Sequence, residues 1–241
     1  KDRYLVALDI GSTKTCALIA SLEETGPKFL GLGAAESRGT RKGLIVNLDA
    51  AVGSIRRALE EAEAAAGVPV EVAVVGVAGS HIRGINSRGG IVLAARPRDI
   101  EREDVRRAVD AARGVTLPED CEILHVLPQE FRVDQQDGIR DPLNMVGLKL
   151  EVNVHIVTAS AAATQNIVTA VNRAGVIVTD TALEPLAAAE AILTSDDREL
   201  GCCVLDIGGG TTEIAVFAGG VIRHSAAMPV GGDHFTNDLA V

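Results

Sequence analysis

Apolar and polar residues alternate in two blocks of the chain, one near each end. In the first block, residues 4–10, 15–22 and 28–35 have the apolar runs and flanking turn residues of three successive strands. In the second block, residues 202–207, 212–217 and 221–228 repeat this arrangement. A predicted helix follows each block, and the second of these opens at Gly231-Gly232. The repeated order of three strands and a helix predicts a duplicated domain.

The regions next to these blocks continue an α/β pattern. Apolar residues recur at helical spacing from 52 to 66, with Asn47 or Asp49 as the N-terminal cap and Gly67 as the stop. Residues 72–78 are fully apolar, which predicts a strand buried on both faces. The later pattern predicts a helix, a short strand, a second helix and a linker, at residues 161–174, 176–178, 184–193 and 195–199.

Residues 81–157 have a different pattern and predict a small α+β insert. We expect a strand at 91–95, an arginine-rich helix that ends at Gly114, and two long strands at 122–133 and 148–157. Apolar and charged residues alternate in the long strands, as in a sheet with one face in water.

Composition limits the possible functions. Hydrophobic residues make up 47% of the 241 residues but aromatic residues only 2%, so Val, Ile, Leu and Ala must form the core. The net charge of −10 argues against nucleic acid as a partner. Residues 83–113 are an exception, with eight Arg against five Asp and Glu. This basic stretch is either a solvated face or a surface that docks a partner.

An eight-residue phrase occurs in both blocks. Residues 8–15 read LDIGSTKT, and residues 205–212 read LDIGGGTT. Glycine lets backbone N–H groups approach a phosphate, hydroxyl groups add donors, and an aspartate at a strand end can hold Mg²⁺ through water. Two such hairpins that face each other would bind a polyphosphate from both sides. The phosphate-loop pattern G-x-x-x-x-G-K-[ST] does not occur in the sequence.

This pair of hairpins is similar to those of the actin, Hsp70 and sugar-kinase superfamily. Within that group, the chain resembles the bacterial cell-division family FtsA. The matching motifs are SRG at 37–39, KG at 42–43, HVLPQEFRVD at 125–134, QDGIRDP at 136–142, VHIVT at 154–158 and ELGCCVLDIGGGT at 199–211.

The resemblance implies an α/β, actin-like (ribonuclease H-like) duplicated domain with an inserted small α+β subdomain. Subdomain 1A would comprise residues 1–80 and 158–179, the inserted subdomain 1C residues 81–157, and the start of subdomain 2A residues 180–241. It also implies that this chain ends within the second copy.

The family resemblance also implies a function. The chain would be the N-terminal portion of an ATP-binding protein, at most a weak ATPase, that polymerises at the division site through contacts of subdomain 1C. Such a protein links FtsZ to the cytoplasmic face of the inner membrane and recruits later division proteins. The FtsZ-docking subdomain and the membrane-binding amphipathic helix are expected outside this chain. The alternatives are a homologue of the pilus-assembly protein PilM, a small-molecule kinase, and an interaction fragment that binds no nucleotide.

Site residues are transferred from the family motif to the matching positions. The resemblance implies that ATP phosphates contact Gly11, Ser12, Thr13, Lys14, Gly208, Gly209, Gly210, Thr211 and Thr212, with Gly231 and Gly232 near the nucleotide. Asp9 and Asp206 would hold Mg²⁺, mainly through its waters.

Three side chains keep alternative interpretations. Glu184 either orients the attacking water or only begins a helix before Pro185. Lys14 either neutralises phosphate charge or is a solvated turn lysine. His125 and His155 fit a structural role better than a metal site.

Overall fold

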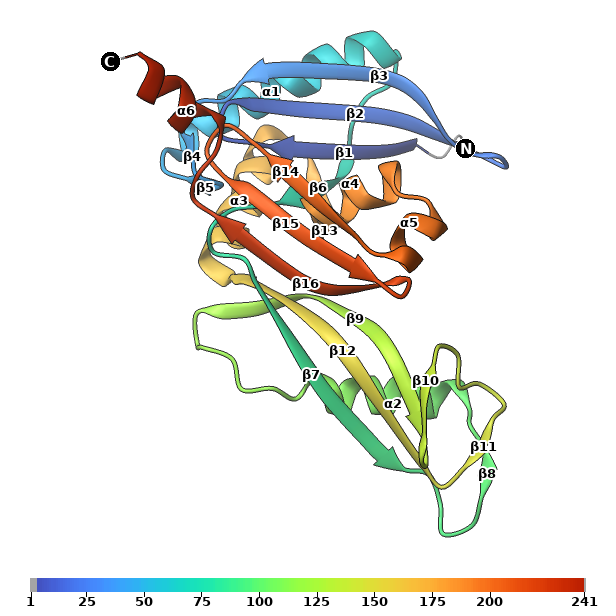
Figure 1. The fold of residues 1–241 in the computed structure, drawn as a ribbon. Coiled ribbons are helices and arrows are strands. Elements are labelled where there is room, and N and C mark those ends of the chain that lie inside the picture. The colour runs from blue at the N-terminus through green and yellow to red at the C-terminus, as the bar shows by residue number, and fades with distance from the viewer. Residues whose placement is uncertain (1–3, 241) are drawn as a thin grey trace.

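The computed structural model describes residues 4–240 of the chain. Residues 1–3 and 241, at the outer bounds of the predicted subdomains, lie outside the described residues. The first block forms three antiparallel strands, β1 (Tyr4–Ile10), β2 (Lys14–Glu23) and β3 (Gly26–Glu36). Two later strands, β6 (Val72–Val77) and β13 (Ile177–Leu183), extend the sheet in parallel to give the order β13-β6-β1-β2-β3 (Figure 1).

Helices α1 (Leu48–Ala66) and α3 (Ala161–Ala174) cover one face of this sheet. The Asn47 side chain caps α1 by accepting from the Ala50 N–H, and Gly67 ends it with a φ of 71°. The helix lies very close to β3, because a Cβ at Gly33 would be 2.0 Å from the carbonyl oxygen of Ala58. A small two-stranded hairpin, β4 (Thr40–Arg41) and β5 (Leu44–Ile45), connects β3 to α1.

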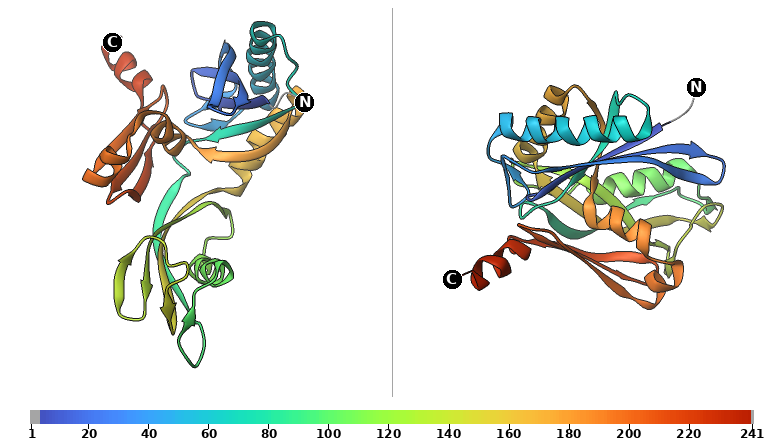
Figure 2. Two further views of the ribbon diagram at one scale, coloured as in Figure 1. Left: turned by 90° about the vertical axis from the view of Figure 1, so that its right-hand side faces the viewer. Right: turned by 90° about the horizontal axis from the view of Figure 1, so that it is seen from above.

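The insert forms its own antiparallel sheet in the order β10-β9-β12-β7. Its strands are β7 (Arg83–Val92), β9 (Cys121–Val133), β10 (Gln136–Ile139) and β12 (Lys149–Ser160). Helix α2 (Arg102–Arg113) covers one face, and the short strands β8 (Arg98–Asp99) and β11 (Val146–Gly147) pair at the far end. Figure 2 shows the insert projecting away from the first sheet.

The second block forms a three-stranded sheet of β14 (Cys202–Ile207), β15 (Thr212–Ala218) and β16 (Val221–Met228). Helix α4 (Glu184–Ile192) packs against one face of it. The short helix α5 (Ser195–Leu200) precedes β14, and α6 (Gly232–Leu239) follows β16 and points away from the sheet (Figures 1 and 2). No helix within residues 4–240 is both long and apolar enough to cross a membrane.

Four sequence predictions of local structure were wrong. The strand predicted at 91–95 is β7, which runs over Arg83–Val92. The prediction missed its start because Gly84, Gly89 and Gly90 interrupt the apolar pattern. The predicted linker at 195–199 is the helix α5, which the Thr194 hydroxyl and the Asp197 carboxylate cap. The strand predicted at 176–178 continues to Leu183. Strand β6 is buried on one face only, since Val72 is exposed.

Candidate functional site

The two copies of the repeated phrase form turns that are closed by an equivalent backbone hydrogen bond. We call residues 11–13 the first turn and residues 208–211 the second turn. In the first, the Gly11 N–H donates to the Lys14 carbonyl over 3.0 Å; in the second, the Gly208 N–H donates to the Thr211 carbonyl over 2.9 Å. The repeated sequence therefore encodes a repeated hairpin.

The two turns lie in contact with each other. A Cβ at Gly209 would be 2.3 Å from Cγ2 of Thr13, and a Cβ at Gly210 would be 2.7 Å from Oγ of Ser12. The glycines of the second turn thus permit an approach that larger residues would prevent.

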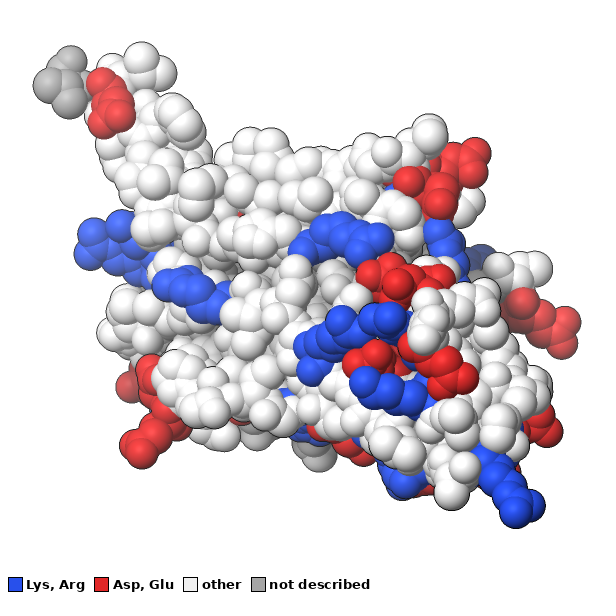
Figure 3. Space-filling view, turned by 60° about the horizontal axis from the view of Figure 1, so that its bottom comes forward, with Lys and Arg blue, Asp and Glu red and all other residues white. Residues whose placement is uncertain are grey.

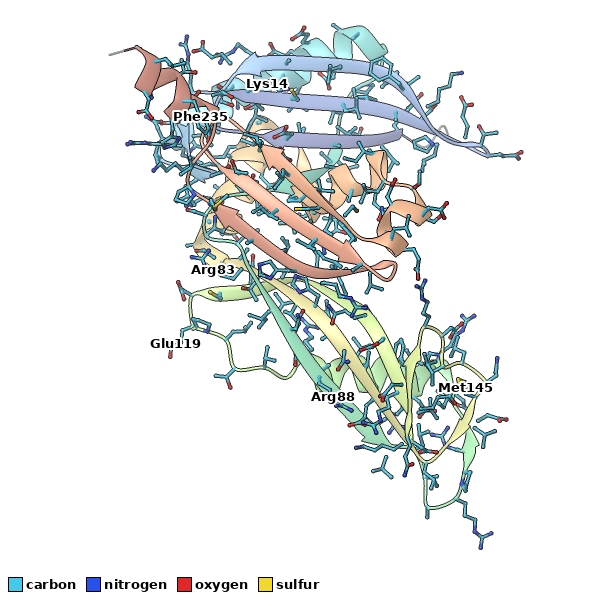
Figure 4. The ribbon with its side chains drawn as sticks, in the orientation of Figure 1. Lys14, Arg83, Arg88, Glu119, Met145 and Phe235 are labelled. Carbon is cyan, nitrogen blue, oxygen red and sulfur yellow. The ribbon has the colours of Figure 1, made fainter. Side chains whose placement is uncertain are left out.

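A cavity of about 300 Å³ lies between the turns. Eleven of the predicted site residues line it: Asp9, Gly11, Ser12, Thr13, Lys14, Glu184, Asp206, Gly208, Gly209, Gly210 and Thr211. They come from β1, β2, α4 and β14 and from the two turns, so distant parts of the chain meet at one site. Figure 4 places Lys14 at the start of β2, at the same end of the molecule as Phe235 of α6.

Three predicted residues do not line this cavity. The Thr212 hydroxyl donates to the Val230 carbonyl over 2.7 Å. The Gly232 N–H donates to the Gly208 carbonyl over 2.9 Å, and a Cβ at Gly231 would be 2.5 Å from that same oxygen. Gly231 and Gly232 therefore support the second turn by backbone contact.

The cavity has an excess of negative charge. Asp9, Glu184, Asp206 and Glu213 line it, and Lys14 is the one lysine or arginine among the described residues that do so. Burial raises the pKa of Glu184 well above its ordinary value, and Asp9, Glu213 and Asp206 raise it further by repulsion. Burial also raises the pKa of Asp9; nearby Lys14 opposes this shift and Asp206 adds to it. The site is therefore suited to accept a cation.

This arrangement fits a hydrated divalent cation. Within residues 4–240, no three His, Cys, Asp or Glu side chains are placed to hold a metal directly. Asp9 and Asp206 end equivalent strands and repel each other across the cavity. Oxygen ligands and retained waters are typical of Mg²⁺ sites that also contact phosphates.

Glu213 is a cavity residue that sequence analysis missed. Its buried carboxylate accepts a hydrogen bond from the Gly79 N–H over 2.9 Å, where the chain enters the insert. Burial raises the pKa of Glu213, although hydrogen bonds from Thr211 and Gly79 oppose this shift. The available signal was a lone carboxylate in the apolar run of residues 213–217, at the position that Cys16 takes in the first copy.

Glu184 and the two histidines have well-defined surroundings. Glu184 is the first residue of α4, as one interpretation of the sequence predicts, and it also lines the cavity. A Cβ at Gly76 would be 2.8 Å from Oε1 of Glu184. His155 bonds to Asn86 and Ser225, and His125 accepts from the Leu183 N–H.

The basic stretch is partly neutralised within the insert. Arg98 and Arg107 both pair with the buried carboxylate of Asp104, and they hold its pKa well below the ordinary range. Arg106 pairs with Glu103 on the surface. On the face shown in Figure 3, basic and acidic side chains are interspersed.

Two family models match the sequence. One, described as the SHS2 domain inserted in FTSA, matches residues 79–158, and the other, described as cell division protein FtsA, matches residues 203–241. Curated relatives match nearly all of the chain. Cell division protein FtsA of Pseudomonas aeruginosa is 46% identical over 240 residues, which are 99% of this chain and 57% of that protein.

Two further FtsA proteins give the same result. Identity is 40% for that of Neisseria meningitidis and 39% for that of Bacillus subtilis, over 100% of this chain and 58% and 54% of the relatives. The chain thus spans a little over half the length of the curated relatives it matches.

Solved structures confirm the predicted actin-like α/β fold. The chain matches a protein chain in the structure of the PilM–PilN type IV pilus biogenesis complex with a TM-score of 0.70 and 18% identity. The match covers 98% of this chain and 64% of the chain in that complex. Ethanolamine utilization protein EutJ from Carboxydothermus hydrogenoformans gives a TM-score of 0.56 and 18% identity, over 100% of this chain and 57% of EutJ.

Proposed function

The chain belongs to the FtsA family of cell-division proteins, and we propose that it binds ATP with Mg²⁺ in the cavity between its two turns. The observation that supports this most is the contact of two equivalent glycine turns around one cavity. Backbone amides and hydroxyl groups from both turns would then bind the phosphates from opposite sides.

The charged residues have separate roles in this proposal. Lys14 neutralises phosphate charge directly. Asp9 and Asp206 hold Mg²⁺ mainly through its water ligands, and the bound ion supplies positive charge to the phosphate oxygens. Gly231 and Gly232 hold the second turn in place through the Gly208 carbonyl.

We propose Glu184 as the residue that orients a water molecule for hydrolysis, with an activity that is weak at most. Its carboxylate lies in the same cavity as both aspartates. A carboxylate whose pKa is raised is a stronger proton acceptor once it is ionised, which suits a general base. Positive charge bound nearby would lower that pKa and favour the ionised form.

For the whole protein, we propose a division scaffold. It would polymerise at the division site, link FtsZ to the cytoplasmic face of the inner membrane and recruit later division proteins. We propose self-association through the insert, at the exposed arginines of α2. Arg107 is exposed but pairs with the buried carboxylate of Asp104, and its substitution would leave that charge less well paired, so Arg102→Glu with Arg106→Glu is the suitable test. Reduced sedimentation of assemblies at high protein concentration supports this surface, and unchanged sedimentation argues against it.

Nucleotide binding is tested by titrating the 241-residue chain with a fluorescent ATP analogue, with and without Mg²⁺. The variants are Lys14→Met and Asp206→Ala, and the control is Lys28→Met, which removes an exposed lysine paired with Glu23. We expect Mg²⁺-dependent binding that both site variants weaken at least tenfold and the control leaves unchanged. Absence of binding at millimolar nucleotide would favour the alternative of an interaction fragment.

A further inference from the structure

A second, smaller cavity adjoins the first. It has a volume of about 180 Å³, and Ser12 and Gly210 line both cavities. Its remaining wall comes from the β4–β5 hairpin and from α6, through Thr40, Arg41, Lys42, Asp233, His234 and Asn237. Neither the nucleotide proposal above nor the repeated phrase accounts for this hairpin.

The hairpin is held in an unusual conformation against the first turn. Lys42 has a φ of 52° and Gly43 a φ of 75°, as in a two-residue turn in which both residues are left-handed. This conformation is unfavourable for lysine, and such residues tend to occur at functional sites. The Gly43 N–H donates to the Ser12 hydroxyl over 3.2 Å, which ties the hairpin to the first turn.

The cavity offers donors that the described chain does not use. The Thr40 hydroxyl oxygen is buried and has no hydrogen-bond partner within residues 4–240. Arg41 and Lys42 form no ion pair with any described carboxylate. The Ser12 hydroxyl accepts from Gly43 and keeps its own proton to donate.

Two features limit what can bind. The Gly232 and Asp233 N–H groups at the start of α6 already donate to the carbonyls of Gly208 and Gly209, so the side chains must supply the binding groups. Asp233 is the one Asp or Glu among the described lining residues. The volume of about 180 Å³ corresponds to about six water molecules, which accommodates a phosphate ion with some water.

We propose that this second cavity binds a single phosphate group through Arg41 and Lys42, and that the Thr40 side chain rotates to donate its unpaired hydroxyl to the same group. The group is either inorganic phosphate or the terminal phosphate of a nucleotide in the first cavity. The second source rests on the proposed nucleotide function, whereas the first does not. Ser12, which lines both cavities, would contact the anion from either side.

The test is a calorimetric titration of the full chain with inorganic phosphate. We compare the wild type with Arg41→Gln/Lys42→Asn, in which asparagine tolerates the left-handed backbone. The charge-matched control is Arg96→Gln/Lys28→Asn, at exposed positions outside both cavities. We expect the site variant to bind phosphate at least tenfold more weakly and the control to equal the wild type.

Two single variants keep the proposal falsifiable if the double variant misfolds, which circular dichroism would report. Thr40→Val removes the buried hydroxyl at nearly constant volume and should weaken phosphate binding about tenfold. Asp233→Asn removes the opposing charge and should strengthen it severalfold. A purely structural role for these residues predicts no such opposite effects.

A parallel titration with ATP and Mg²⁺ identifies the source of the phosphate. If Arg41→Gln/Lys42→Asn weakens phosphate binding but changes the affinity for ATP less than threefold, the cavity binds free phosphate. If the same variant weakens ATP binding tenfold or more, the cavity holds the terminal phosphate of ATP. Equal phosphate and ATP affinities in wild type and site variant would overturn the proposal. Failure of nucleotide binding itself would appear separately, as ATP binding that is absent or insensitive to Lys14→Met.

Discussion

The two copies of the repeated phrase have the same strands and turns but very different surroundings. Leu8 is 1% exposed, whereas Leu205 at the matching position is 57% exposed; for Ile10 and Ile207 the values are 7% and 62%. Helices α1 and α3 cover the first face. Among the described residues, no helix packs on the matching face of the second sheet. The local sequence therefore determines that a hairpin forms. The elements that pack on the sheet determine how far its apolar side chains are buried.

The second sheet is held by polar contacts with the insert. The Gln129 amide donates to the Ile222 carbonyl over 2.7 Å, His155 bonds to the Ser225 hydroxyl over 2.8 Å, and Arg140 donates to the Gly219 carbonyl over 3.0 Å. An apolar cluster with α4 and Leu127 of the insert also packs against this sheet, but it is smaller than the cluster that covers the first sheet. The two halves of the phosphate site should therefore respond differently to mutation and to pH.

The largest difference is expected for matched leucine substitutions. Leu8→Ala removes a fully buried side chain and should lower the free energy of unfolding by about 2–5 kcal/mol. Leu205→Ala, at the equivalent exposed position, should change it by about 0.5 kcal/mol or less. Chemical denaturation of both variants measures this contrast. Equal losses would show that the second face is also packed in solution.

Acid should loosen the contact between the insert and the second sheet. Burial, with a contribution from His224, lowers the pKa of His155 to about 4. In the unfolded chain this pKa is near 6.5, so the unfolded state binds more protons between these values and stability is lost as pH falls. Protonation of His155 should lower the free energy of unfolding by about 3 kcal/mol at pH 4.

Thermal unfolding at several pH values measures this effect. His155→Gln should retain a hydrogen-bonding side chain but show a smaller loss of stability between pH 6.5 and pH 4. An unchanged pH dependence in this variant would exclude His155 as the group responsible.

A pH effect of opposite sign is expected at the cavity. Because the pKa of Glu184 is raised in the folded state, the folded chain binds more protons than the unfolded chain above the ordinary glutamate pKa. Stability should therefore fall as pH rises through this range. Glu184→Gln should raise Tm relative to the wild type at pH 8 and have little effect at pH 4.5. Added Mg²⁺ should reduce the difference at pH 8 if the cation binds in this cavity.

The smallest effect on stability is expected at the contact between the turns. Gly209→Ala places a methyl group 2.3 Å from Cγ2 and 2.9 Å from Oγ1 of Thr13, so one turn must shift, and we expect a loss of about 1 kcal/mol. ATP affinity should nevertheless fall because the turns are displaced. Gly114→Ala is the control, since its Cβ would lie at an ordinary 3.4 Å from its nearest neighbour and the residue is outside the cavity. Equal ATP affinity in both variants would argue against a functional contact.

Much of this fold could be predicted from sequence because its signals are local. Helix α3 ends at Gly175 and α1 at Gly67, and both glycines have a positive φ. The repeated phrase identified the first turn, the second turn and both aspartates. Sequence analysis missed the start of β7, because Gly89 faces the backbone of α2 and gives no apolar signal. Glu213 was missed because its role depends on Gly79, a residue 134 positions away.

In the proposed phosphate site, both turns bind the same ligand. Hydrogen exchange of the backbone amides at residues 11–14 and 208–212, measured with and without ATP and Mg²⁺, tests it most directly. Exchange should slow in both turns over the same range of ATP concentration, and Asp206→Ala should abolish the slowing in both. Slowing confined to one turn would contradict a two-sided phosphate site.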